Sequence, residues 1–200
     1  LMRIGFDAKR AFSNNTGLGN YSRDTIRVLS YHFPKTKYFI YTPKKNKNTR
    51  ENFISDSENT IIRTPESLLN RALKKYWRSK SIVKDLFTNK INIYHGLSNE
   101  LPLGIEKTSI KTIVTIHDLI FIRYPNLFKA IDRKIYQIKF KSACVRADKI
   151  IAVSEQTKKD IIDFFFIPER KITVVYQGCN TVFQNKITEN KKNHIITKYN

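Results

Sequence analysis

The feature that most constrains the fold is an alternation between short, apolar, often β-branched runs and longer segments of helical periodicity. Such an alternation is typical of β/α units around a mostly parallel sheet, whose strands are buried on both faces. The sequence therefore predicts an α/β, Rossmann-like fold with a mostly parallel sheet and helices on both of its faces. The expected strands are Arg3–Phe6, Tyr38–Tyr41, Thr60–Arg63, Ile91–Tyr94, Thr112–Ile116, Lys149–Val153 and Lys171–Val175.

Apolar residues at helical spacing mark the faces by which the intervening helices are expected to pack. Three such stripes are Leu18, Ile26, Leu29 and Phe33; Leu69, Ala72, Leu73, Tyr76, Val83 and Phe87; and Ile131, Ile135, Ile138 and Val145. A last helix is expected to begin after Ser154 as its N-cap and to end near Phe166, because Pro168 follows.

The length of 200 residues and a hydrophobic content of 40% are enough for one domain with its own core. After Phe183 the chain becomes polar, so we expect residues 1–183 to form an N-terminal domain and residues 184–200 to begin a linker to a further domain. No apolar run is long enough to span a membrane and the first residues do not resemble a secretory signal, so a cytoplasmic protein is expected. Cys144 and Cys179 have no metal-ligand spacing and are expected to be reduced.

The formal net charge of +20 favours polyanionic partners, namely phosphate groups, anionic lipid or nucleic acid, without choosing among them. A Lys-, Asn- and Ile-rich coding bias explains the same charge equally well. A nucleic-acid-binding Rossmann-like module without catalytic activity is thus the alternative hypothesis. Against it, the chain has no basic motif with interleaved aromatic residues.

Chemically useful residues follow three of the expected strands, where ligands bind in open α/β sheets. Asp7 follows the first strand, and Gly17, Leu18, Gly19 and Asn20 then open the first helix. The backbone N–H groups at such a helix start can hold a phosphate or hydroxyl group. His95 follows the fourth strand, and His117 and Asp118 follow the fifth. We expect these residues to form a substrate-binding edge, with His117 as the catalytic candidate.

Each of these residues also has a structural interpretation. The glycine pair fits a turn or helix entry, His95 fits a hydrogen-bonded core position, and Asp118 fits a loop brace. His117 is the stronger candidate because burying both it and Asp118 in an apolar stretch would be costly. A dinucleotide fingerprint is excluded, since Gly17 lies ten residues after Asp7 and Ser22 stands at the third glycine position. P-loop and G-x-S-x-G motifs are absent from the sequence.

Taken in order, several short motifs resemble the N-terminal domain of glycosyltransferase family 4, the retaining enzymes of GT-B fold, and especially its mannosyltransferase-like members. They cover nearly the whole chain. The motifs are Met2-Arg3-Ile4-Gly5-Phe6-Asp7-Ala8, Thr16-Gly17-Leu18-Gly19-Asn20-Tyr21, His95-Gly96 with Leu101-Pro102, Val114-Thr115-Ile116-His117-Asp118-Leu119 with Tyr124-Pro125, Ala147-Asp148-Lys149-Ile150-Ile151-Ala152-Val153-Ser154-Glu155, and Lys171-Ile172-Thr173-Val174-Val175-Tyr176-Gln177-Gly178.

The resemblance implies transfer of a sugar from a nucleotide-sugar donor to a glycan or lipid-linked acceptor, as in surface polysaccharide synthesis. Transfer would retain configuration and need no cofactor or metal. The Gly17 to Gly19 segment would face an interdomain cleft, His117 would lie beside the transferred sugar, and a C-terminal donor-binding domain outside this chain would carry an E-x7-E motif. This chain alone would then be inactive. Asn20 stands where many relatives carry Arg, which weakens one expected phosphate contact.

A basic segment over residues 68–87 has two interpretations. Its cations are Arg71, Lys74, Lys75, Arg78, Lys80 and Lys84. They could lie against an anionic bilayer at the inner membrane face and present a lipid-linked acceptor. The favoured interpretation is an ordinary surface helix packed through its leucine stripe, because that stripe is spaced for a core. The same argument applies to the basic helix that contains Lys129, Arg133, Lys134, Lys139 and Lys141.

Overall fold

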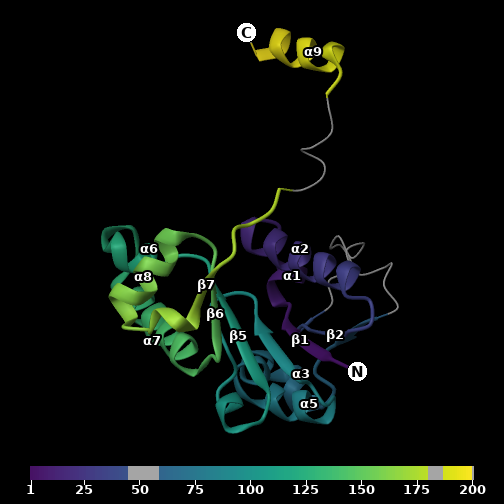
Figure 1. Ribbon diagram of the computed structural model, residues 1–200, viewed down its shortest axis with the longest axis vertical. Coiled ribbons are helices and arrows are strands. Elements are labelled where there is room, and N and C mark those ends of the chain that lie inside the picture. Colours follow the sequence, from purple (N-terminus) through teal and green to yellow (C-terminus); the bar gives the residue numbers. More distant parts are fainter. Residues whose placement is uncertain (45–58, 180–186, 200) are drawn as a thin grey trace.

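In the computed structural model, which describes residues 1–44, 59–179 and 187–199, a single parallel sheet forms the centre of the molecule (Figure 1). Over these ranges its seven strands have the order β3-β2-β1-β4-β5-β6-β7, and every neighbouring pair is parallel. The Rossmann-like prediction is confirmed. The strands are β1 Arg3–Asp7, β2 Lys37–Tyr41, β3 Thr60–Arg63, β4 Ile93–Gly96, β5 Lys111–Ile116, β6 Lys149–Ala152 and β7 Ile172–Val174.

The fourth strand begins two residues later than the sequence predicted. Ile91 still takes part in the turn that closes the helix Ile82–Thr88, since its N–H donates to the carbonyl oxygen of Leu86 at 3.0 Å. Pairing with β1 begins only at Ile93. His95 is therefore inside β4, and the expectation that it follows the strand is wrong.

Helices cover both faces of the sheet, as predicted. One face packs against α1 and α2 through a cluster that includes Phe12 and Ile26. The other packs against α5, α7 and α8 through Leu86, Cys144 and Ile161. The helices are α1 Lys9–Ser13, α2 Gly17–His32, α3 Leu68–Ala72, α4 Lys74–Tyr76, the π-helical turn η2 Trp77–Ser81, α5 Ile82–Thr88, the 3-10 turn η3 Ile105–Lys107, α6 Ile120–Arg123, the 3-10 turn η4 Pro125–Leu127, α7 Ala130–Arg146, α8 Glu155–Phe165, the 3-10 turn η5 Glu169–Lys171 and α9 Glu189–Tyr199.

The helix α8 has the ends that the sequence predicted. The hydroxyl oxygen of Ser154 accepts a hydrogen bond from the N–H of Thr157 at 3.1 Å, which is an N-cap. At the other end Phe166 adopts a left-handed conformation, with φ of 58°.

The prediction that the apolar stripe of the segment 68–87 is buried against the core is wrong in large part. The segment is divided into short helical pieces, and the π-helical turn changes which side chains face the sheet. Trp77, Ile82 and Leu86 are buried in the core, whereas Leu69 and Leu73 are 63% and 50% exposed. The indole N–H of Trp77 donates to Asp85 at 2.6 Å, which satisfies it inside the core.

The prediction that the stripe of Ile131, Ile135, Ile138 and Val145 packs α7 on the core is also wrong. Ile131 and Ile138 are 75% and 61% exposed, whereas Ala143 and Cys144 on the opposite side of the helix are buried. The inward side is completed by aromatic contacts, since Phe140 meets Phe121 edge-on at 5.2 Å. The small residues thus pack closely on the sheet, and the larger aliphatic ones face outward. The first stripe is partly confirmed: Ile26 is buried, but Phe33 is exposed.

Part of the predicted linker is helical. The helix α9 covers Glu189–Tyr199 and buries none of its residues. The predicted boundary at residue 183 lies outside the described residues. Within the described part of the chain, we find no helix with the length and hydropathy needed to span a bilayer.

Candidate active site at the carboxyl edge of the sheet

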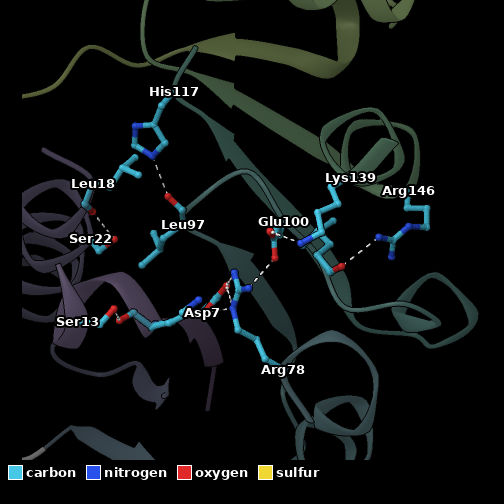
Figure 2. A network of polar contacts seen from close by, with 12 residues as sticks. Asp7, Ser13, Leu18, Ser22, Arg78, Leu97, Glu100, His117, Lys139 and Arg146 are labelled. Carbon is cyan, nitrogen blue, oxygen red and sulfur yellow. Dashed lines mark hydrogen bonds and ion pairs between the residues drawn. The ribbon is translucent and has the colours of Figure 1, made fainter. Parts of the chain in front are cut away.

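His117 lies directly after β5, where its ring and backbone are both held by the protein. The ring nitrogen Nε2 is 2.9 Å from the carbonyl oxygen of Leu97 (Figure 2), and the backbone N–H donates to the side-chain oxygen of Asn99 at 2.9 Å. A carbonyl oxygen can only accept, so Nε2 carries the hydrogen and Nδ1 is the ring acceptor. Burial lowers the pKa of His117, which favours the neutral ring. His117 is thus a fixed, neutral hydrogen-bond acceptor.

The same strand end joins His117 to the glycine segment through Tyr21. Tyr21 is two residues beyond Gly19 on α2, and its ring meets the His117 ring edge-on, with centroids 4.7 Å apart. Its hydroxyl group is 3.0 Å from the hydroxyl oxygen of Thr115 on β5. The two motifs that the sequence placed at one edge therefore do lie together. Tyr21 was not identified from the sequence as a site residue.

His95 lies below this edge and fits the structural interpretation. Its Nε2 is 2.8 Å from the hydroxyl oxygen of Thr115, and its ring lies 5.8 Å from that of Phe6. Burial, with a smaller contribution from His117, lowers the pKa of His95 to about 3. The side chain is only 4% exposed. Its contacts support Thr115, which in turn contacts Tyr21, so His95 holds this part of the edge from inside the core.

The glycines of the segment have different surroundings. A Cβ on Gly19 would lie 1.8 Å from the backbone oxygen of Asn14, so a side chain is sterically excluded there. A Cβ on Gly17 would meet nothing within 4 Å. Thr16 makes no side-chain cap and the first turn of α2 has no acidic residue, which leaves this helix start suited to an anion. Asn20 is turned to Arg23, from which it accepts a hydrogen bond at 2.6 Å.

Asp7 ends β1 but is engaged by a buried cation. Arg78 of η2 donates three hydrogen bonds to the Asp7 carboxylate, at 2.6, 2.9 and 3.1 Å (Figure 2). The same guanidinium donates to Glu100 at 2.6 Å, and Lys139 of α7 donates to Glu100 at 3.3 Å. Arg78 and Asp7 are 16% and 5% exposed. Burial by itself lowers the pKa of Arg78, but the two carboxylates together outweigh it and raise this pKa above its usual value.

A pocket of about 220 Å³ opens beside this ion-pair network, between η2, the segment after β4 and α7. Its lining includes Asp7, Arg78, Leu103, Ile138 and Arg146. Arg146 is held in place, since it donates to the carbonyl oxygens of Leu101 and Pro102. The pocket combines an apolar wall with fixed charges of both signs.

The predicted residues therefore fall into two groups. His117 lies beside Tyr21 and the start of α2, whereas Asp7 faces the pocket with Arg78 and Glu100. Asp118 is exposed and accepts from the N–H of Ile120 at 3.2 Å, which fits a loop brace. Among the described residues, no group of three or more His, Cys, Asp or Glu side chains could hold a metal ion.

The sequence did not identify Arg78 as a site residue, because it stands among exposed cations of the basic segment. The signal that could have found it is the adjacent Trp77. A tryptophan is seldom placed on a basic surface helix, and its burial turns the next residue toward the end of β1.

The family model for glycosyltransferase family 4 matches residues 18–183. The chain belongs to glycosyltransferase family 4. Among solved structures, a glycosyltransferase from Rickettsia africae is similar over 99% of this chain and 49% of its own, with a TM-score of 0.54 and 16% identity. HepE from Anabaena in complex with UDP is similar over 98% of this chain and 50% of its own, with a TM-score of 0.61 and 10% identity. No curated protein matches the sequence.

These similarities give the family 4 chain its place in a known architecture. It has the fold of the N-terminal half of a GT-B glycosyltransferase and spans about half the length of the solved structures it matches. Because the strands are parallel, the residues after β1, β4 and β5 lie at the carboxyl edge of the sheet, where ligands bind in open α/β folds. His117, Tyr21 and the start of α2 lie at this edge.

Proposed function

We propose that this domain forms the acceptor-side half of a retaining glycosyltransferase that transfers a sugar from a nucleotide-sugar donor to a glycan or lipid-linked acceptor. The observation that carries the proposal is the contact of Tyr21 with His117, which brings the start of α2 and a neutral histidine to one edge. The N–H groups at the helix start favour a diphosphate, and Nδ1 of His117 accepts a hydrogen bond from a sugar hydroxyl group. HepE was solved with UDP, which supports a nucleoside diphosphate sugar as the donor.

The chemistry proposed for this half-site is positional and electrostatic. His117 stays neutral near pH 7 and holds the transferred sugar by a hydroxyl group, while the α2 start stabilises charge on the departing diphosphate. We propose that a second domain, joined after residue 183, grips the nucleotide and that activity needs both domains. Neither a metal nor a cofactor is part of the proposed mechanism.

The proposed setting is surface polysaccharide synthesis on the cytoplasmic side, with peripheral contact at an anionic inner membrane face. The net charge of +20 supports such a contact. Nucleic acid is not proposed as a partner, because net charge is the only feature that favours it.

The test is sugar transfer by the full-length enzyme, with His117→Ala compared with His32→Ala. His32 is the matched control because it is an exposed histidine that also meets a tyrosine ring edge-on, at 5.1 Å from Tyr31. We expect His117→Ala to lower kcat by about 100-fold, in line with the loss of one transition-state hydrogen bond, and His32→Ala to leave it unchanged. Unchanged transfer by folded His117→Ala would refute the role of His117.

A further inference from the structure

The helix α7 has two apolar sides, and the described part of the chain covers only one of them. Phe140, Ala143 and Cys144 pack toward the sheet. On the opposite side Ile131, Ile135, Ile138 and Val145 are 75%, 43%, 61% and 55% exposed. At 3.6 residues per turn these four side chains share one stripe along the helix. We call this stripe the outer face of α7.

Basic residues border the outer face along its length. Lys134 and Lys141 lie along one border, and Lys139 and Arg146 lie along the other. Over residues 129–146 the sequence has six cations, counting Lys129 and Arg133, and one acidic residue, Asp132. Lys134 and Lys141 are exposed. An exposed aliphatic stripe bordered by exposed lysines is the pattern of a helix that lies in the plane of an anionic bilayer surface.

The second border of this face reaches the pocket. Ile138, Lys139 and Arg146 line the pocket together with Arg78, and Lys139 points to Glu100 at its side (Figure 2). A bilayer against the outer face would therefore lie next to the pocket and to the ion pair at the end of β1. The apolar wall formed by Leu103 and Ile138 continues from the outer face into the pocket.

The basic segment over residues 68–87 is the weaker surface for this purpose. It is divided into pieces of five, three, five and seven residues, so that it presents no continuous stripe. Two of its members face inward, because Trp77 is buried and Arg78 binds Asp7. By contrast, α7 is a single helix of seventeen residues.

We propose that the outer face of α7 docks this protein on an anionic lipid bilayer and so brings the pocket to the membrane surface. The bilayer contact rests on the outer face alone. The consequence that the acceptor is lipid-linked rests on the proposed function. An anionic bilayer fits this face best, because the aliphatic side chains can insert among the lipid chains and the flanking lysines attract anionic headgroups.

The experiment measures binding of the full-length protein to vesicles by sedimentation. The vesicles are phosphatidylcholine alone, or phosphatidylcholine with about one-third phosphatidylglycerol. We expect binding to the anionic vesicles only, weakened by salt. The variant Lys134→Gln/Lys141→Gln should lower the partition coefficient by about 30-fold, since two basic residues near an anionic surface are lost. The variant Ile131→Gln/Ile138→Gln should lower it by about tenfold or more.

The matched control is Val28→Ser/Tyr31→Ser on α2, which removes exposed apolar side chains that are 42% and 78% exposed and lie on the other face of the sheet. It should bind as the unaltered protein does. Vesicle binding that is equal in all three variants would overturn the proposal. Two other results would also overturn it. One is that the unaltered protein is a dimer that Ile131→Gln/Ile138→Gln dissociates, and the other is that this variant has a lower unfolding midpoint. Either result would mean that the outer face packs against protein and is not free for a bilayer.

Sugar transfer to a soluble acceptor separates this proposal from the proposed function. If Lys134→Gln/Lys141→Gln, which lies outside the pocket lining, loses vesicle binding and retains that transfer, docking and catalysis are both supported as separate properties. If the unaltered protein binds vesicles but transfers no sugar from any nucleotide sugar tested, the proposed function fails and the docking surface stands.

Discussion

The ion pair between Asp7 and Arg78 makes a quantitative prediction about stability. Asp7 is 5% exposed and accepts three hydrogen bonds from a guanidinium that is 16% exposed. Removing one partner of a buried pair costs about 3 to 5 kcal/mol, because the other charge stays buried. Glu100 still contacts Arg78 in the variant, so the loss of unfolding free energy for Asp7→Asn should lie at the lower end of this range, near 3 kcal/mol.

The assay is urea unfolding followed by circular dichroism. With a slope of about 2 kcal/mol per molar urea, the midpoint for Asp7→Asn should fall by about 1.5 M. The control is Asp24→Asn, which makes the same change in an exposed pair with Arg27 and should cost under about 0.5 kcal/mol. In Asp7→Asn/Arg78→Met the stranded cation is gone, so the loss should be smaller than the sum of the single losses by about 2 kcal/mol. A cost below about 1 kcal/mol for Asp7→Asn, or strict additivity, would refute this reasoning.

Three further predictions concern the same edge and its supports. Burial keeps His95 unprotonated to a pKa of about 3, whereas the unfolded chain takes up this proton near pH 6.5. The free energy of unfolding should therefore fall by about 1.4 kcal/mol per pH unit from about pH 6 to pH 4, and His95→Gln should reduce that slope in urea titrations; an unchanged slope would contradict the assignment. Gly19→Ala should destabilise by several kcal/mol because of the Asn14 oxygen, whereas Gly17→Ala should change stability by less than about 1 kcal/mol. Equal melting temperatures for the two glycine variants would be inconsistent with this packing. Ser154→Ala should cost about 1 kcal/mol through loss of the α8 cap, and Ser154→Asp should restore most of it in thermal melts; a failure of aspartate to restore stability would point to a cause other than capping.

Much of the fold could be predicted because its signals are local. Buried parallel strands require continuous apolar runs, and these runs located six of the seven observed strands to within about a residue and found the seventh, β4, two residues early. The Ser154 cap and the following proline likewise fixed both ends of α8. Because parallel strands end at a common edge, the order of motifs also predicted that Gly17 and His117 lie at the same edge of the sheet.

Tertiary structure alone decided how these elements face one another. A helical stripe shows which residues share a side of α7, but the choice between Ile138 and Cys144 as the buried side depends on how closely the helix approaches the sheet. Likewise, the π-helical turn at Trp77 rotates Arg78 toward Asp7, a contact between residues 71 positions apart. Periodicity is a property of neighbours in sequence, whereas burial and ion pairing depend on the packing of distant segments, so the sequence determined the sheet and its edge, and the packing decided which charges and apolar faces remain free.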